Sequence, residues 1–370
     1  MKDGKHMQCI HLAGTNGKGS TALYLANILG ESHKCGLFTS PHIFTPRERF
    51  AIDGEMISQA DYDSYMSAAG RQPGEHWFSV WVRVAQKWFA DNAVDYAVIE
   101  TGLGGSRDQT NFFDSAMQII TPVSLDHTAE LGNDVRKIAL EKAGIIKWGA
   151  TVVSHPQQAD AAEVIRRTCD HLDNLLIVLD DKKIRLKQAA PEGQVFDFSY
   201  RDLDLRRAEI SAISPAQLSN ACVAAVAARE LGIDPDDIAM GLKKTVIAAR
   251  AQYIDGMLID AAHNEAAILE LKRTVKKYFA KKNITVLTAV MEDKDISAIA
   301  GGIDSFADNV ICTCADKKRG LAASEYAKYF DDAFAMEDPA YAFDYAKETA
   351  ERKKGMLVVC GSFYLLPYVM

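Results

Sequence analysis

The feature that most constrains this chain is a glycine-rich loop between a predicted strand and a predicted helix. The apolar run 7–13 is followed by Gly-Thr-Asn-Gly-Lys-Gly-Ser-Thr at 14–21, and a helical pattern begins at Gly19. Glycines let backbone N–H groups converge on phosphate oxygens, the helix N-terminus adds its dipole, and Lys18 adds a positive charge. A glycine-rich helix entry without a ligand is the alternative, but it would need neither the lysine nor the hydroxyl groups. The loop therefore predicts a nucleotide phosphate site.

The rest of the chain alternates short β-branched runs with longer helical patterns, which is typical of a parallel sheet with crossover helices. Residues 179–213 alternate apolar and charged side chains like a β-ribbon insertion. We expect an α/β protein with an N-terminal, P-loop-type parallel-sheet ATPase domain over 1–246 and a smaller, Rossmann-like C-terminal α/β domain over 247–370. The predicted strands are 7–13, 96–100, 117–125 and 151–154 in the first domain and 257–261, 284–290, 309–314 and 356–360 in the second.

Composition narrows the classes of function. Charged residues make up 25% and hydrophobic residues 48% of the chain, as in folded globular proteins. The formal net charge is −8, and no basic stripe is interleaved with aromatic residues, so we expect small-molecule substrates and no nucleic-acid partner. The densest basic run, 272–282, has apolar residues at helical spacing, and its charges are predicted to coat a solvent face.

The same composition predicts a cytoplasmic protein. No apolar run approaches the ~20 residues of a membrane helix, and the N-terminus has no export signal, so no membrane partner is expected. The seven cysteines include no CxxC pair, which favours a reducing compartment. Cys312 and Cys314 lie in an apolar run and are predicted to be small core residues rather than zinc ligands.

Several further blocks follow the glycine-rich loop in a fixed order. The loop places Gly19 between Lys18 and Ser20, whereas the common nucleotide loop has the lysine directly before the hydroxyl residue. The later blocks are Phe-Thr-Ser-Pro-His at 38–42, Glu-Arg-Phe at 48–50, Val-Ile-Glu-Thr-Gly-Leu-Gly-Gly at 98–105, Asp-His at 126–127, Glu-Lys-Ala-Gly-Ile-Ile-Lys at 141–147, Asp-Ala-Ala-His-Asn at 260–264, Asp-Lys-Asp at 293–295 and Gly-Ser-Phe-Tyr at 361–364. The loop resembles that of Mur ligases, and the loop and the blocks together are similar to the folylpolyglutamate synthase/dihydrofolate synthase family.

The resemblance implies an ATP-dependent carbon–nitrogen ligase that activates a carboxylate as an acyl phosphate and releases ADP and phosphate. It implies a folate or dihydropteroate as the acid, L-glutamate as the amino acid, and a monomeric enzyme. Two alternatives stay open: the same chemistry on a non-folate carboxylic acid of specialised metabolism, and a nucleotide-binding regulatory protein without catalysis. The second alternative is disfavoured because a mere binder needs no acyl-phosphate machinery.

The resemblance also implies a catalytic and metal-binding set. Glu100 ends a predicted strand at the edge where α/β sheets bind ligands, and the family uses this position for Mg²⁺. Lys142 stands fifteen residues after His127, where the family carries a carbamylated lysine that holds a second ion. Its helical pattern over 135–146 would by itself make Lys142 a solvated surface charge. The implied catalytic residues are Lys18, Glu100, His127 and Lys142, and the implied metal ligands for two Mg²⁺ ions are Ser40, Glu100, His127 and Lys142.

Further contacts to ATP and to the two substrates are implied in the same way. Asn264 has a second interpretation, since it could also cap the helix that follows it. The implied ATP contacts are Thr15, Asn16, Gly17, Lys18, Gly19, Ser20, Asn220, Arg250 and Asp260. The implied substrate contacts are His42, Trp77, Phe78, Arg107, His263, Asn264 and Ser362.

Three segments depart from the family pattern, and two of them fall on the acid side. His-Trp-Phe-Ser at 76–79 lacks the family's glutamate at the last position, Ser-Arg at 106–107 replaces Arg-Leu, and Ile-Ala-Ala at 247–249 replaces Trp-Pro-Gly. The aromatic side chains near 76–79 could stack on a planar acid. Alternatively, the i, i+4, i+11 spacing of Trp77, Trp81 and Trp88 is that of a helix core face. Without the glutamate we expect folate to bind more weakly than is usual for the family.

Overall fold

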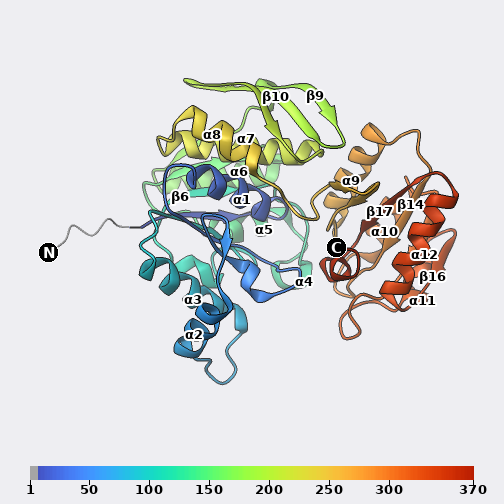
Figure 1. Cartoon of the computed structure of the whole chain (residues 1–370). Helices are drawn as coiled ribbons and strands as arrows, with labels where there is room; N and C mark the ends of the chain where they lie inside the picture. The colour runs from blue at the N-terminus through green and yellow to red at the C-terminus, as the bar shows by residue number, and fades with distance from the viewer. Residues whose placement is uncertain (1–6) are drawn as a thin grey trace. The chain divides into compact units, whose positions relative to one another are not determined.

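The computed structural model describes residues 7–370, and the chain forms two compact units (Figure 1). None of the helices among these residues is both long and apolar enough to cross a membrane. The first unit comprises residues up to 187 together with 195–210 and 219–245, and the second comprises 188–194, 211–218 and 246–370.

The first unit is built on an eight-stranded sheet of order β4-β3-β2-β5-β1-β6-β7-β8. Strands β3 and β4 are antiparallel at one edge, and the other six strands run parallel. The carboxyl ends of the parallel strands therefore meet at one edge, which is where open α/β sheets bind ligands. The strands are β1 (Gln8–Ala13), β2 (Cys35–Phe38), β3 (Phe50–Ile52), β4 (Glu55–Met56), β5 (Tyr96–Glu100), β6 (Ser115–Ile120), β7 (Thr151–Ser154) and β8 (Leu175–Val178).

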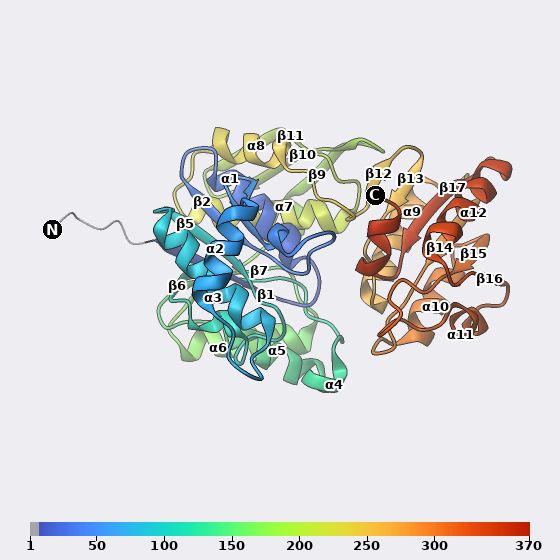
Figure 2. The ribbon, with the colours of Figure 1, turned by 60° about the horizontal axis from the view of Figure 1, so that its bottom comes forward.

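Helices cover this sheet with apolar faces. Helix α3 buries Val84 and Trp88 at a spacing of one turn, and α2 lies beside it (Figure 2). Helix α5 ends at Ala143, with Gly144 as its C-cap, rather than at the predicted residue 146, and Gly144 packs so closely on Ser106 that an added Cβ atom would lie 2.3 Å from Ser106 Cβ. The helices are α1 (Lys18–Leu29), α2 (Gln59–Ala69), α3 (Trp77–Asp91), α4 (Thr128–Leu131), α5 (Val135–Ala143), α6 (Ala159–His171), α7 (Pro215–Glu230) and α8 (Pro235–Lys244), with the 3₁₀ turns η1 (Pro46–Arg49), η2 (Gln109–Phe112) and η3 (Asp181–Lys183).

A three-stranded sheet of order β11-β10-β9 occupies the segment predicted as a β-ribbon. Its strands are β9 (Ile184–Ala190), β10 (Gly193–Tyr200) and β11 (Leu203–Ile210). The alternating apolar and charged pattern of this segment was therefore a valid strand signal.

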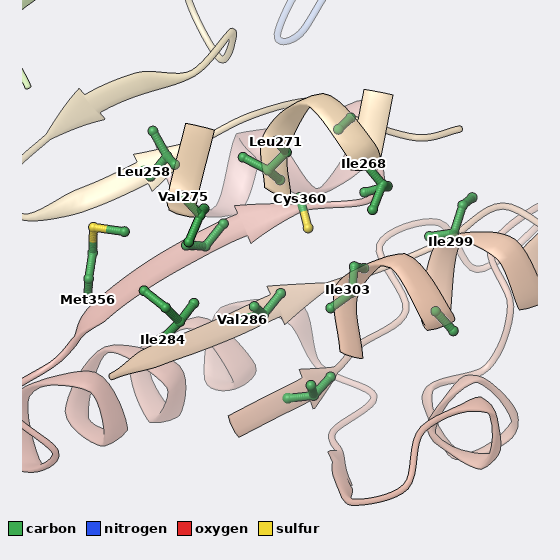
Figure 3. Close-up of a cluster of buried hydrophobic side chains, with 14 of the residues drawn as sticks. Leu258, Ile268, Leu271, Val275, Ile284, Val286, Ile299, Ile303, Met356 and Cys360 are labelled. Carbon is green, nitrogen blue, oxygen red and sulfur yellow. The ribbon is translucent and has the colours of Figure 1, made fainter. Parts of the chain in front are cut away.

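The second unit has a six-stranded sheet of order β12-β13-β17-β14-β15-β16, parallel except for β12. Its core contains Leu258 and Val286 from the strands and Ile268, Leu271 and Val275 from α9 (Figure 3). The elements are β12 (Gln252–Ile254), β13 (Met257–Ile259), β14 (Ile284–Thr288), β15 (Asn309–Cys312), β16 (Ala333–Ala335), β17 (Met356–Cys360), α9 (Glu265–Tyr278), α10 (Ile296–Asp304), α11 (Ala323–Tyr326), α12 (Pro339–Arg352), η4 (Ala327–Tyr329) and η5 (Phe363–Tyr368).

Several predicted strands extend too far at their carboxyl ends. The run 117–125 forms a strand only to Ile120, because the carbonyl of Pro122 turns to accept hydrogen bonds from the glycine-rich loop. Apolar composition alone does not show where a strand ends and a ligand-binding loop begins. The cysteines are all free, with Cys312 buried in β15 and Cys314 half-buried, as expected for core residues.

Candidate active site

The glycine-rich loop joins β1 to α1 at the carboxyl edge of the first sheet. Gly17 caps α1 in the left-handed conformation, with φ of 88°. The backbone N–H of Thr15 donates to the carbonyl of Pro122 at 2.8 Å, and the Thr15 hydroxyl donates to the carbonyl of Ser124 at 3.0 Å. The loop is thus fastened to the segment after β6, which holds its backbone in place for a ligand.

Glycines in this loop are needed because neighbouring groups leave no room for side chains. A Cβ atom on Gly14, whose φ is +156°, would lie 1.8 Å from the Thr121 hydroxyl oxygen. A Cβ atom on Gly17 would lie 2.7 Å from Oδ1 of Asn220, which places this predicted ATP contact against the loop. One on Gly19 would lie 3.2 Å from Glu100 Oε2.

The close approach at Gly14 predicts that Gly14→Ala lowers the free energy of unfolding by about 1–3 kcal/mol, through the clash with Thr121 and the strained φ. Gly54→Ala is the matched control, because Gly54 also has positive φ but has no atom within 4 Å of an added Cβ. Urea titration measures both losses. Equal losses in the two variants would show that the clash in the loop is unimportant.

Lys18 curls back over the loop that precedes it. Its Nζ donates to the carbonyls of Gly14 at 3.2 Å and Thr15 at 3.3 Å, and it lies 4.0 Å from Glu100 Oε1. Glu100 ends β5, is 3% exposed, and accepts a hydrogen bond at Oε2 from the backbone N–H of Ser40 at 2.8 Å. The fold therefore brings Lys18, Glu100 and Ser40 together from three separate loops.

Lys142 is buried beside the same loop. It is 5% exposed, and its Nζ donates to the carbonyl of Gly14 at 2.7 Å. Burial, followed by the nearby charge of Lys18, lowers the pKa of Lys142 to about 7. The solvent-exposed position that the helical pattern alone predicts is therefore wrong, and the amine lies at the edge of the predicted phosphate site.

His127 lies in the loop after β6, at the same edge of the sheet. It adopts φ of 49° and precedes α4, and its backbone N–H donates to Oδ1 of Asp126 at 2.9 Å. Within residues 7–370 no three His, Cys, Asp or Glu side chains are grouped as a metal site. Proteins usually bind Mg²⁺ through one or two carboxylates plus substrate phosphates.

The loop after β5 carries the altered Ser-Arg pair and is fastened to α5 by Glu141. The Ser106 hydroxyl donates to Glu141 Oε2 at 2.6 Å, and the backbone N–H of Arg107 donates to Oε1 at 3.1 Å. The Arg107 side chain is 77% exposed, and its Nε lies 3.5 Å from Glu141 Oε2. Arg107 is thus held at the surface of this loop, and Glu141 is a positioning residue that the sequence did not single out.

The predicted acid-side residues form an aromatic and cationic stack. The Arg49 guanidinium lies 4.3 Å from the ring centre of Trp81, and its Nε donates to His42 Nδ1 at 2.9 Å. Trp81 and Trp77 stack with ring centres 6.5 Å apart, and Arg71 lies 4.7 Å from the ring centre of Trp77. The stack presents cations at both ends of a pair of indole rings.

Trp77 and Trp88 differ in burial, so the interpretation of their spacing as a helix core face holds for only one of them. Trp88 is 6% exposed and belongs to the core, as the helical spacing predicted, but Trp77 is 49% exposed, so the core interpretation is wrong for it. Phe78 lies under the loop after β5, where a Cβ atom on Gly102 would approach its ring to 2.6 Å. Phe78 therefore supports this loop, while Trp77 is half-exposed and contacts Trp81 and Arg71.

A second group of predicted residues converges within the second unit. Asp260 follows β13 and accepts a hydrogen bond at Oδ2 from the backbone N–H of Ala251 at 2.7 Å, and burial raises its pKa to about 6. Arg250 lies 4.8 Å from the ring centre of Phe363, and the His263 ring lies 5.5 Å from it. Phe363 thus organises the cluster, although no charge or spacing marked it in the sequence.

Two polar residues of this cluster cap helices. Asn264 Oδ1 accepts from the backbone N–H of Ala267 at 2.9 Å, which confirms the capping interpretation of Asn264 for α9. Ser362 caps η5 and accepts from the backbone N–H of Tyr364 at 3.1 Å. His263 donates from Nδ1 to the carbonyl of Ala261 at 2.8 Å, which fixes the orientation of its ring.

Comparisons with a family model, with one relative and with two solved structures give consistent findings. Residues 246–363 match the family model described as Mur ligase, glutamate ligase domain. The sequence is 30% identical to the dihydrofolate synthase/folylpolyglutamate synthase of Bacillus subtilis (strain 168), over 98% of this chain and 89% of that protein. The fold is similar to Mycobacterium tuberculosis folylpolyglutamate synthase complexed with ADP and AMPPCP, with a TM-score of 0.90, 28% identity, and coverage of 98% of this chain and 90% of that one. A bifunctional folylpolyglutamate synthase/dihydrofolate synthase with Mn, AMPPNP and L-glutamate bound gives a TM-score of 0.86 at 26% identity, covering 99% and 89% of the two chains.

Proposed function

Because the chain belongs to the folylpolyglutamate synthase/dihydrofolate synthase family of Mur ligases, we propose that it joins L-glutamate to a carboxylic acid at the expense of ATP. The carboxylate attacks the γ-phosphate, giving ADP and an acyl phosphate. The amine of glutamate then attacks the acyl carbon, and phosphate leaves as the amide forms. The observation that carries this proposal is the convergence of Lys18, Glu100 and Lys142 on one glycine-rich loop.

We assign the binding of ATP and of the amino acid to different domains. We assign ATP binding to the domain 1–246, through the loop residues Thr15 to Ser20 and Asn220. The domain 247–370 is assigned the amino acid, through His263, Asn264 and Ser362, with Arg250 and Asp260 completing the nucleotide contacts. A monomer is sufficient, since all of these residues come from one chain.

Mg²⁺ would be held by Ser40, Glu100 and His127, and Lys142 as its carbamate would hold a second ion. Bound Mg²⁺ supplies positive charge that neutralises the oxygens of the transferring phosphoryl group. Glu100 fits this role because its buried carboxylate lies over Gly19 at the start of α1. Lys18 supplies the remaining fixed cation.

Carbamylation of Lys142 is favoured by its surroundings. An amine with a pKa of about 7 is about half unprotonated at neutral pH, far more than an ordinary lysine, and only the unprotonated form attacks CO₂. Two ammonium groups sharing the carbonyl of Gly14 would repel each other, whereas a carbamate beside Lys18 would be attracted to it.

The lowered pKa predicts a specific pH dependence of stability in CO₂-free buffer. Unfolded Lys142 has a pKa near 10.4, so between about pH 7 and pH 10 the unfolded state holds a proton that the folded state lacks. The free energy of unfolding should therefore rise with pH across this window, by on the order of 1 kcal/mol per pH unit, relative to Lys142→Met. Urea titrations of both proteins across the window test this. Parallel curves would contradict the lowered pKa.

A folate or dihydropteroate is the first candidate acid, and a non-folate planar acid is the second. The second is favoured by Arg71 and Trp77, which place a cation against a half-exposed indole ring in the segment that lacks the family's glutamate. A phosphate-release screen under saturating ATP and L-glutamate, comparing dihydropteroate, tetrahydrofolate and unrelated acids, decides between them. If no acid drives release of phosphate with formation of an amide, the proposed function is wrong.

Trp77→Ala should raise the KM for a planar acid about tenfold and leave the KM for ATP unchanged, because only the acid would contact the exposed part of the indole ring. Trp88→Ala is the contrasting variant, since Trp88 is buried and its loss should lower stability instead. Steady-state kinetics and urea titration of both variants separate the two effects. An unchanged KM for the acid in Trp77→Ala would remove Trp77 from the acid site.

A further inference from the structure

A chain of buried hydrogen bonds joins β1 to the loop that follows β5. His11 lies in β1, close before the glycine-rich loop, and His11 and Thr110 are both fully buried. Nε2 of His11 lies 2.8 Å from the hydroxyl oxygen of Thr110. The same hydroxyl donates a short hydrogen bond to Oδ1 of Asp108. None of these three side chains is assigned to ATP, Mg²⁺ or either substrate.

The single proton of the Thr110 hydroxyl determines which groups donate in this chain. A carboxylate only accepts hydrogen bonds, so the hydroxyl proton is used on Asp108 and the hydroxyl oxygen accepts from His11. Burial, followed by the nearby charge of Lys147, lowers the pKa of His11 to about 3, so its ring is neutral and has one N–H. That N–H is therefore on Nε2, and Nδ1 has no hydrogen-bond partner within residues 7–370.

Asp108 extends this chain to the part of the loop that packs on α5. Its Oδ2 accepts a hydrogen bond from the backbone N–H of Leu103 at 2.8 Å, which closes the loop around the carboxylate. Within the closed loop, Gly105 packs on the backbone of Glu141 and Lys142, and an added Cβ atom would lie 2.5 Å from the carbonyl oxygen of Glu141. The strand before the glycine-rich loop is thereby connected to the packing that buries Lys142.

We propose that Thr110 is a positioning residue for phosphoryl transfer, which acts by holding the loop after β5 against Lys142. The inference rests on the proposed function, since only that function gives Lys142 and Glu100 a role in the reaction. Thr110 is fully buried and would not contact ATP or the acid, so its loss should lower kcat rather than raise the KM values. Partners that orient ligand-binding groups typically contribute roughly 10-fold to 100-fold to activity.

Steady-state kinetics of two substitutions test this role. Thr110→Val keeps the shape of the side chain but leaves the N–H of His11 without its acceptor, whereas Thr110→Ser keeps the hydroxyl. With the acid that drives phosphate release, Thr110→Val should lower kcat about tenfold and change the KM for ATP and for the acid less than about twofold. Thr110→Ser should keep the kcat of wild type.

The matched control is Thr274→Val. Thr274 is equally buried, but it lies in the second unit and its hydroxyl donates within its own helix, to the carbonyl of Glu270 at 3.1 Å. The control should therefore keep the kcat of wild type even if it is less stable in urea. A wild-type kcat in Thr110→Val would overturn the proposal, because a merely structural hydroxyl would affect stability alone. An equal loss of kcat in Thr110→Ser would overturn it as well.

NMR tests the hydrogen-bond chain without substrates. In ¹⁵N-labelled wild type, His11 should be the Nε2–H tautomer. Hydrogen exchange of the Leu103 amide should become about tenfold faster in Thr110→Val, as expected for one lost buried hydrogen bond, and should be unchanged in Thr110→Ser and Thr274→Val. An Nδ1–H tautomer of His11 in wild type, or unchanged exchange of the Leu103 amide in Thr110→Val, would overturn the proposal. If both NMR results are as expected but wild type ligates no acid, the proposed function fails while the attachment of the loop is supported.

Discussion

Replacing Lys18 with alanine is expected to lower kcat/KM by roughly 100-fold or more, which corresponds to about 3 kcal/mol of lost transition-state stabilisation. Phosphoryl transfer to a carboxylate brings anions together, and a cation fixed beside the loop offsets their repulsion as the charge develops. Lys18 is placed for this because its Nζ is anchored on the carbonyls of Gly14 and Thr15, next to Glu100.

The experiment is a steady-state assay of phosphate release by Lys18→Ala, with Lys34→Ala as the matched control. Lys34 follows α1 at an exposed position, so its loss should leave kcat/KM unchanged. Urea titration of Lys18→Ala should show a stability close to that of wild type. Near-normal turnover by Lys18→Ala would contradict the role of the loop.

Lys142→Ala is expected to be nearly inactive while remaining folded. The variant loses the carbamate that would hold the second Mg²⁺, and removing a buried amine should not weaken the fold. A short carboxylate such as acetate can occupy the vacated space and replace the anion, so partial recovery of activity at high acetate is expected.

Carbon-13 NMR after equilibration with labelled bicarbonate tests the modification itself. A carbamate signal is expected in wild type and in Lys137→Ala, which removes an exposed lysine of the same helix, but not in Lys142→Ala. Full activity of Lys142→Ala would show that the carbamate has no role in catalysis. The same conclusion would follow if the wild-type protein were active but showed no carbamate signal.

The sequence predicts part of the site well where a local order of strand, loop and helix carries residues suited to binding phosphate. A strand, a loop rich in glycine and a helix follow one another over 7–29, and this order alone predicts a phosphate site at a sheet edge. Glu100 was placed correctly at a strand end because the strand that precedes it is short and continuously apolar.

The rest depends on tertiary contacts that no local pattern contains. Lys142 has the spacing of a surface lysine, and it is buried only because the loop after β5 packs on α5, with Gly105 against the backbone of Glu141 and Lys142. Trp77 and Trp88 share one helical spacing, but their exposure differs because the sheet covers only part of α3. Phe363 stands in the block 361–364, but its contacts with Arg250 and His263 depend on the tertiary fold, in which β13 and β17 lie side by side.

The central claim is that the acid is activated as an acyl phosphate, and the fate of carboxylate oxygen tests it most directly. The acid that drives phosphate release is labelled with ¹⁸O in its carboxylate and incubated with ATP and L-glutamate. We expect one ADP and one phosphate for each amide formed, with one ¹⁸O atom in the phosphate, because that oxygen bridges carbon and phosphorus in the intermediate. Formation of AMP and pyrophosphate, with the label in AMP, would contradict the account.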